Sequence, residues 1–163
     1  MTNQKISISN ISYKNDESVR ILTAVFSKWF SNPKTFYYTS PNLKYPFNMN
    51  LWVSTFYKQN NVETYVLKDE KWIIGHLSIK IDRNENLAHL FHLIIDKENR
   101  QKGHARKLIS YVEKQVIADN NIKAITIKCV KKNIPAIKLY QSMNFQKLKE
   151  KKWLKMIKYL DKK

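Results

Sequence analysis

The chain has 163 residues, 30 basic and 13 acidic side chains, and a formal net charge of +17. Its hydrophobic fraction of 43% excludes a disordered chain, so we expect one domain over residues 1–163. No apolar run approaches the roughly 20 residues that span a bilayer, and we expect neither a signal peptide nor a membrane partner. The single cysteine, Cys129, excludes an intrachain disulfide and a cysteine-rich metal site, so we expect no metal and a reducing, cytoplasmic location.

The large positive charge favours anionic partners such as nucleotides, phosphates, nucleic acid or acidic protein surfaces. A second explanation is compositional, because a chain rich in lysine, asparagine and isoleucine is what an AT-rich genome encodes. The sequence leaves both explanations open.

The first half of the chain predicts one strand and two helices. Residues 5–11 alternate between apolar and polar side chains, as a half-buried strand does. Asp16 or Ser18 can cap a helix whose apolar side chains recur at helical spacing as far as Phe30. The stretch 31–47 contains three prolines and many aromatic residues, and this composition predicts a loop. A short helix is expected around residues 50–58.

The second half predicts strands at 62–67 and 71–81, joined by a turn at Asp69-Glu70, and an almost continuously apolar strand at 87–95. A clear helix at 104–117, an alternating strand at 122–130 and a helix at 133–143 follow. Apolar spacing favours a helix for residues 152–160, although the short aromatic run also fits a strand. The pattern predicts an α/β (mixed α+β) chain with helices on the faces of a mixed sheet.

Glycine is rare, since Gly75 and Gly103 are the only two where average usage gives roughly eleven. Gly103 lies in a basic turn, Arg100 to Ala105, between the apolar strand and the clearest helix. A helix start offers unpaired amides and partial positive charge to an anion, and small residues let a phosphate approach. The alternative is that Gly103 only permits a tight turn. The phosphate motifs G-x-x-x-x-G-K-[ST] and G-x-G-x-x-G are absent.

Two segments resemble a known family. Arg100-x-x-Gly103-x-Ala105 resembles the [Q/R]-x-x-G-x-[G/A] signature of the GNAT superfamily of N-acetyltransferases. About forty residues later, the segment from Asn133 through Tyr140 to Asn144-Phe145 resembles its second motif. The resemblance implies a GNAT fold, with a mixed, mostly antiparallel sheet of about six to seven strands and about four helices. It also implies an N-acetyltransferase, with acetyl-CoA as co-substrate and direct attack by a primary amine in a ternary complex.

The resemblance also implies roles for individual residues. Backbone groups of Leu93 and Ile95 would pair with the pantetheine arm along the strand that includes Ile94. Asn133 and Ala136 would lie beside the cofactor, and Tyr140 would protonate the leaving thiolate, unless it is only a core residue. The family's glycine is Asn144 here, which tolerates a left-handed conformation. The pyrophosphate would bind the amides of Arg100, Gln101, Lys102, Gly103, His104, Ala105 and Arg106.

A general base is useful because an amine must be neutral to attack a thioester. Counting back from Arg100, His89 lies where relatives carry their base, and Ala88-His89-Leu90 resembles a segment of aralkylamine acetyltransferases. His92 lies on the opposite face of a regular strand, unless a bulge intervenes. A water chain and a merely packed histidine remain alternatives, and His76 and His104 are further candidates.

The aromatic stretch from Phe36 to Trp52 lies where the family forms its acceptor wall. Few acidic side chains are available for a polyamine or aminoglycoside, so a small-molecule or peptide amine ranks above those substrates. Two other functions remain open: a basic nucleic-acid-binding module, which no nucleic-acid motif supports, and a non-catalytic acyl-CoA sensor. The sequence does not fix the oligomeric state, and a homodimer is one alternative.

Overall fold

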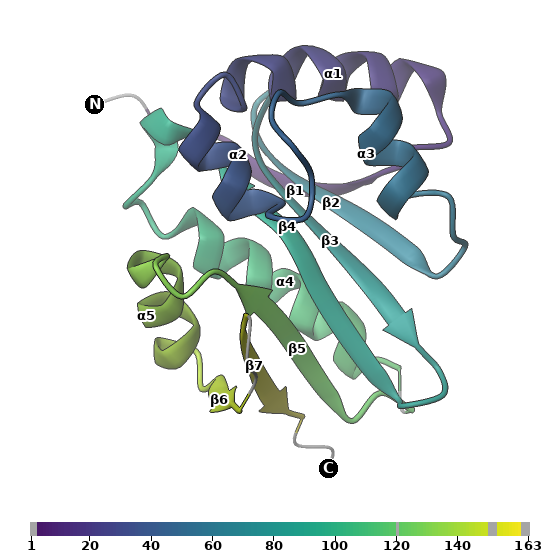
Figure 1. The fold of residues 1–163 in the computed structure, drawn as a ribbon, viewed down its shortest axis with the longest axis vertical. Helices are drawn as coiled ribbons and strands as arrows, with labels where there is room; N and C mark the ends of the chain where they lie inside the picture. The colour runs from purple at the N-terminus through teal and green to yellow at the C-terminus, as the bar shows by residue number, and fades with distance from the viewer. Residues whose placement is uncertain (1–2, 120, 150–152, 161–163) are drawn as a thin grey trace.

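The computed structural model describes residues 3–119, 121–149 and 153–160. In these ranges seven strands form one sheet in the order β1-β2-β3-β4-β5-β7-β6 (Figure 1). Neighbouring strands are antiparallel except β4 and β5, which run parallel. The expected mixed, mostly antiparallel sheet is confirmed. The strands are β1 (Ile6–Ile11), β2 (Val62–Asp69), β3 (Trp72–Asp82), β4 (Leu87–Ile95), β5 (Ala124–Cys129), β6 (Gln146–Leu148) and β7 (Leu154–Tyr159).

The described ranges contain five α-helices, where the sequence predicted about four, and one short 3-10 turn at Lys97–Asn99. The additional helix is α2, which lies in the stretch expected to be a loop. Asn32 accepts hydrogen bonds from the amides of Lys34 and Thr35, and Pro33 occupies the first turn, where proline is tolerated. The helices are α1 (Asp16–Trp29), α2 (Pro33–Thr39), α3 (Met49–Phe56), α4 (His104–Ile117) and α5 (Ile134–Ser142).

The N-cap of helix α1 lies before both of its expected caps. The N-cap is Asn15, whose side-chain oxygen accepts the Ser18 amide at 2.9 Å, so neither Asp16 nor Ser18 has that role. Asp16 and Glu17 instead lie in the first turn, where negative charge favours the helix dipole.

Two apolar clusters cover the two faces of the sheet. One joins α4 and α5 to the sheet through residues such as Leu108, Ile125 and Ile137. The other joins α1, α2 and α3 through residues such as Phe26 and Trp52. Neighbouring residues on β2 and β4 contribute to different clusters, as strand geometry requires. Figure 1 shows α1, α2 and α3 grouped together, apart from α4 and α5.

The carboxyl-terminal segment forms a strand where apolar spacing favoured a helix. Residues 154–159 pair with the whole of β5 and with β6, a short strand that the sequence did not predict. Met156 and Ile157 are both buried, because one faces each side of a sheet that is covered on both sides. Residue 152 of the ambiguous segment lies outside the described ranges.

Strand β4 contains a bulge at His92. Ser78 pairs with Phe91 and His76 pairs with Ile94, so β4 has one more residue than β3 in this interval. His92 adopts a positive φ of 52°. A bulge of this kind re-aims side chains. His92 therefore faces the same aromatic cluster as Phe91, on the side of the sheet where His89 also lies.

A buried chain of hydrogen bonds holds this bulge. His76 Nδ1 donates to the His92 carbonyl at 2.7 Å, and Tyr13 donates to His76 Nε2 at 2.8 Å. The His92 ring lies between the hydroxyls of Tyr57, at 2.7 Å, and Ser40, at 3.1 Å. Burial lowers the pKa of His76 to about 4 and also lowers the pKa of His92. Both rings are neutral in the folded protein near neutral pH.

We predict that the free energy of unfolding falls as the pH drops from about 6.5 toward 4. The unfolded chain takes up protons on both histidines near their ordinary pKa, whereas the folded chain resists protonation, at a cost of up to about 1.4 kcal/mol per pH unit for each ring. His76→Gln keeps a donor for the His92 carbonyl and removes one titrating group. Urea unfolding at pH 6.5, 6.0, 5.5 and 5.0 should give a shallower slope in the variant, and an unchanged slope would contradict the prediction.

Candidate functional site

Strands β4 and β5 separate along their length. They pair only between Leu87–Leu90 and Ala124–Ile127, so residues 91–95 of β4 have no partner on β5 (Figure 1). Leu93, Ile94 and Ile95 lie in this unpaired part. Backbone groups at an open strand edge can pair with an extended, peptide-like ligand as an added strand does.

The turn that follows β4 carries a run of unpaired amides. Among the described residues, none of the amides from Gln101 to Arg106 donates to a protein acceptor, and the first helical bond runs from Lys107 to the Gly103 carbonyl at 3.0 Å. Gln101 and Gly103 have positive φ angles of 61° and 79°. Consecutive unpaired amides at the start of a helix, here one of 14 residues, are a geometry suited to binding an anion.

Three side chains of this turn, those of Arg100, Arg106 and His104, have structural partners. Arg100 Nε donates to the Ile95 carbonyl at 2.9 Å and thereby fixes the turn to the end of β4. Arg106 donates to Ser142 Oγ at 2.6 Å and joins the start of α4 to the end of α5. His104 hydrogen bonds to Gln4. These three side chains fix the turn to its neighbours, and its backbone amides are left without a protein acceptor among the described residues.

Gly75 occupies a position where β3 approaches the end of β4. A Cβ there would lie 2.8 Å from Ile95 Cδ1 and 3.2 Å from Leu67 Cβ, which are closer than ordinary contacts. Both glycines of the chain are thus explained by backbone geometry. Gly75 allows close packing behind the open edge of β4, and Gly103 allows the left-handed turn after it.

Helix α5 places the second motif beside this edge. Asn133 is its N-cap, yet its side chain accepts no helix amide. Ala136 and Tyr140 pack in the same cluster as Leu93, Ile95 and residues of α4. Asn144 follows the helix with a φ of 71°, which confirms that asparagine supplies the left-handed conformation expected there.

The Tyr140 side chain is buried between α5 and the sheet. Burial, together with the neighbouring Cys129 thiol, raises the pKa of Tyr140 well above its usual value. Burial likewise raises the pKa of Cys129 to about 11. Both groups remain protonated at neutral pH, so Tyr140 can act as a proton donor.

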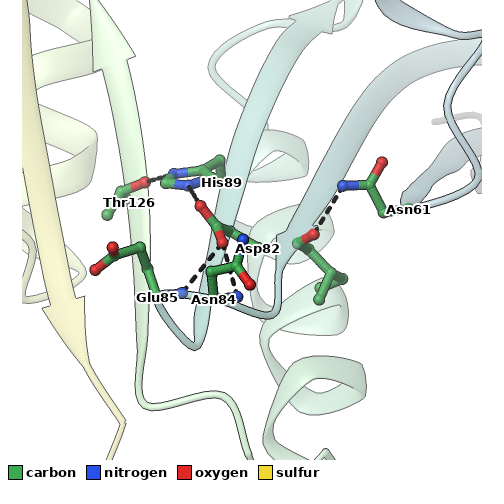
Figure 2. Close-up of polar contacts among 7 residues, drawn as sticks. Asn61, Asp82, Asn84, Glu85, His89 and Thr126 are labelled. Carbon is green, nitrogen blue, oxygen red and sulfur yellow. Dashed lines mark hydrogen bonds and ion pairs between the residues drawn. The ribbon is translucent and has the colours of Figure 1, made fainter.

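A pocket of about 390 Å³ opens on the α2–α3 side of the sheet, where β4 and β5 separate. His89 lines it, half-buried, and its Nδ1 hydrogen bonds to Thr126 Oγ1 on β5 (Figure 2). Its Nε2 lies 4.0 Å from the Asp82 carboxylate. Burial and the charge of Lys155 lower the pKa of His89, with smaller effects of Lys80 and Lys128, while Asp82 opposes them.

The other histidines are held in structural contacts. His92 also lines the pocket, but both of its nitrogens are hydrogen bonded and its ring stacks on Trp52 at a centroid distance of 3.8 Å. His76 is buried under Tyr13, and His104 lies in the anion-binding turn. His89 is therefore the histidine that combines contact with the pocket, partial exposure and a ring nitrogen without a hydrogen bond among the described residues.

Several pocket residues were missed by the sequence reasoning. Lys80, Thr126, Lys128 and Lys155 come from strands β3, β5 and β7, and all four line the pocket. Polar residues alternate with isoleucine on β5, which marks two of them as facing away from the α4 cluster. The order of the strands, which sequence does not give, is what brings them together.

Among the described residues, no group of three or more His, Cys, Asp or Glu side chains is arranged to hold a metal ion. A separate survey of the helices in the same ranges found none with the length and apolar character needed to cross a membrane.

Residues 24–145 match the family model described as Acetyltransferase (GNAT) family, whereas no curated protein sequence matches significantly. A domain from Methanocaldococcus jannaschii DSM 2661 is similar, with a TM-score of 0.76 and 21% identity over 97% of this chain and 100% of that one. Spermidine N-acetyltransferase from Vibrio cholerae, in complex with CoA and spermine, has a TM-score of 0.75 and 17% identity over 96% of each chain. The ribosomal-protein-S18-alanine N-acetyltransferase from Escherichia coli has a TM-score of 0.72 and 12% identity over 97% of this chain and 96% of that one. At these identities the likeness shows the fold alone.

We predict that Gly103→Ala lowers the free energy of unfolding by about 1–2 kcal/mol, because a left-handed conformation strains any residue with a Cβ. The alanine Cβ meets no atom within 4 Å, so strain and not collision sets this loss. Gly103→Asn should lose less, since asparagine tolerates this conformation. Urea unfolding of the three proteins tests the order, and an alanine variant as stable as the parent would refute it.

Proposed function

The chain belongs to the GNAT family of acetyltransferases, and we propose that it transfers an acetyl group from acetyl-CoA to a primary amine of a small molecule or peptide. The observation that carries this proposal is the run of unpaired amides from Gln101 to Arg106 directly after the open edge of β4. An extended ligand with an anionic end fits both features at once.

The residues available suit this co-substrate. The amides of the turn would hold the pyrophosphate, and the backbone of Leu93 and Ile95 would pair with the pantetheine arm. Asn133 and Ala136 would contact the arm from α5. When bound, acetyl-CoA supplies the activated acetyl thioester.

His89 and Tyr140 are the proposed base and acid. His89 accepts a proton from the attacking amine, because its pKa lies below the ordinary value and the ring is neutral at pH 7. The new bond joins the amine nitrogen to the acetyl carbon, and the carbon–sulfur bond breaks. Tyr140 gives its proton to the departing sulfur, which is consistent with a buried hydroxyl that stays protonated.

We predict that the protein releases free CoA thiol from acetyl-CoA in the presence of at least one amine of a broad panel. Tyr140→Phe should lower kcat by about 10²–10⁴-fold, as expected for loss of a general acid, with little change in acetyl-CoA affinity. Thermal shift with acetyl-CoA serves as the binding control. Binding of acetyl-CoA without thiol release from any amine would identify a sensor, and stabilisation by oligonucleotides alone would favour a nucleic-acid module.

We predict that kcat/KM falls at acidic pH with a midpoint below 6.5, because His89 must be neutral and its pKa is lowered. His89→Ala should lower kcat/KM by about 10²–10⁴-fold and abolish this acidic limb. Lys114→Ala offers a control, since Lys114 is exposed on α4 and does not line the pocket. An acidic limb that persists unchanged in His89→Ala would exclude His89 as the base.

A further inference from the structure

The His89 ring lies between two polar side chains, one at each of its nitrogens (Figure 2). Its Nδ1 hydrogen bonds to Thr126 Oγ1, and the two residues are direct partners in the register of β4 and β5. Its Nε2 lies 4.0 Å from Asp82 Oδ2 at the end of β3. Three neighbouring strands thus contribute one residue each, and the two outer residues determine which nitrogen of His89 carries the hydrogen.

The Asp82 carboxylate is held by the turn that joins β3 to β4. Its Oδ1 accepts the amides of Asn84 and Glu85 at 3.0 and 3.1 Å, and its Oδ2 is the oxygen nearer the ring (Figure 2). A neutral imidazole has one N–H group and one nitrogen lone pair. A lone pair on Nε2 would face a negative carboxylate, whereas an N–H group there is attracted to it. Asp82 therefore favours a hydrogen on Nε2.

A hydrogen on Nε2 makes Nδ1 the acceptor in the bond to Thr126. The Thr126 hydroxyl is then the donor, because the neutral ring offers only a lone pair at Nδ1. A hydroxyl has a single hydrogen, so the Thr126 oxygen presents only lone pairs to a further partner. A hydroxyl bonded to a histidine in this way can take up a proton from that partner while it passes its own to the ring.

The pocket lies on the Thr126 side of this set. Thr126 and His89 both line it, whereas Asp82 does not. An amine in the pocket can therefore approach Thr126, while Nε2 faces a carboxylate outside the lining. The Thr126 side chain belongs to a residue that is 2% exposed, and valine has the same shape without a buried polar group that needs a partner. Packing alone does not call for a hydroxyl at this position.

Asp82 also favours the charged form of the ring. Burial is the largest influence that lowers the pKa of His89, and the charges of three lysines act in the same direction, namely Lys155, Lys80 and Lys128. Asp82 acts in the opposite direction and raises the pKa. A carboxylate beside Nε2 therefore stabilises the imidazolium that forms when Nδ1 takes up a proton.

We propose that Thr126 takes the proton of the acceptor amine and passes its own to His89 Nδ1, while Asp82 positions the ring through Nε2. This inference rests on the proposed acetyl transfer and adds two residues to it. As an N–H bond of the amine breaks, its proton joins Thr126 Oγ1, and the former hydroxyl proton forms the N–H bond at Nδ1. Thr126 is a hydroxyl again after this step, and the positive charge lies on His89. The His89 side chain is 32% exposed, so the ring can return the proton to water before the next turnover.

The tautomer of His89 tests this arrangement without turnover. In a 15N NMR spectrum at about pH 7.5, the His89 signals are assigned by their loss in His89→Gln. They should show a protonated Nε2 and an unprotonated Nδ1. A hydrogen on Nδ1 would overturn the proposal, because Thr126 would then accept the hydrogen bond and could not pass a proton to the ring.

Kinetics separate a proton relay from a hydroxyl that only supports the fold. Thr126→Val keeps the shape of the side chain and should lower kcat by about 10²–10⁴-fold, as loss of the base does, whereas Thr126→Ser should stay within about threefold of the parent. The double variant Thr126→Val with His89→Ala should be no slower than either single variant, since residues that act as a unit are not additive. Losses that multiply, or a valine variant as active as the parent, would overturn the relay.

Asp82→Asn gives a readout in the pH profile. Without the carboxylate the pKa of His89 falls, so the acidic limb of kcat/KM should move to lower pH by about half a unit or more, and kcat should fall about fivefold. Asp16→Asn is the control, because it removes an exposed carboxylate from the first turn of α1 and should leave the limb in place. An acidic limb that does not move in Asp82→Asn would overturn the role of Asp82.

The outcomes separate this inference from the proposed function. Thiol release with an amine, combined with a hydrogen on Nδ1 or with a fully active Thr126→Val, would overturn the relay and leave acetyl transfer standing. Absence of thiol release with every amine would overturn acetyl transfer and the relay with it, even where the NMR spectrum shows the expected tautomer.

Discussion

The hydrogen bond from His76 to the carbonyl of His92 is the interaction on which the site depends. A bulge removes this carbonyl from regular pairing with β3, and a buried carbonyl needs a partner. His76 supplies it from within the core. The re-aimed His92 ring then joins Ser40 after α2 to Tyr57 after α3. The bulge therefore fixes the pocket wall relative to the part of β4 that separates from β5.

Electrostatics divide the molecule into two environments. The interior beneath the pocket is polar yet uncharged, because His76 and His92 are buried, hydrogen bonded and held neutral. The pocket above contains three lysines and a half-buried histidine. Part of the large positive charge is thus concentrated at one place on the sheet.

Local sequence signals predicted most elements well. The strand at 87–95 and the helix at 104–117 have the expected bounds, since continuous apolarity and helical spacing are strong in both. The prediction of a loop at α2 was wrong. It rested on the three prolines of the stretch 31–47, but Pro33 lies in the first turn of the helix, where proline is tolerated, and Asn32 caps that helix. The preference for a helix at 154–159 was also wrong. Only Met156 and Ile157 of its six residues are buried, and they are adjacent in sequence, so the strand shows no regular alternation and its pairing with β5 decides its conformation.

The sequence by itself predicted the turn from Arg100 to Arg106, because a strand end, a left-handed glycine and a helix start are contiguous there. Its resemblance to the family's motifs also singled out His89, Asn133 and Tyr140. Only the tertiary structure decided what surrounds them. The bulge that turns His92, and the strand order that brings Lys80, Lys128 and Lys155 to one pocket, arise from pairing between segments far apart in the chain. The spacing of residues in the sequence does not reveal which strands pair or in what register, so the lining of the pocket could not be predicted from it.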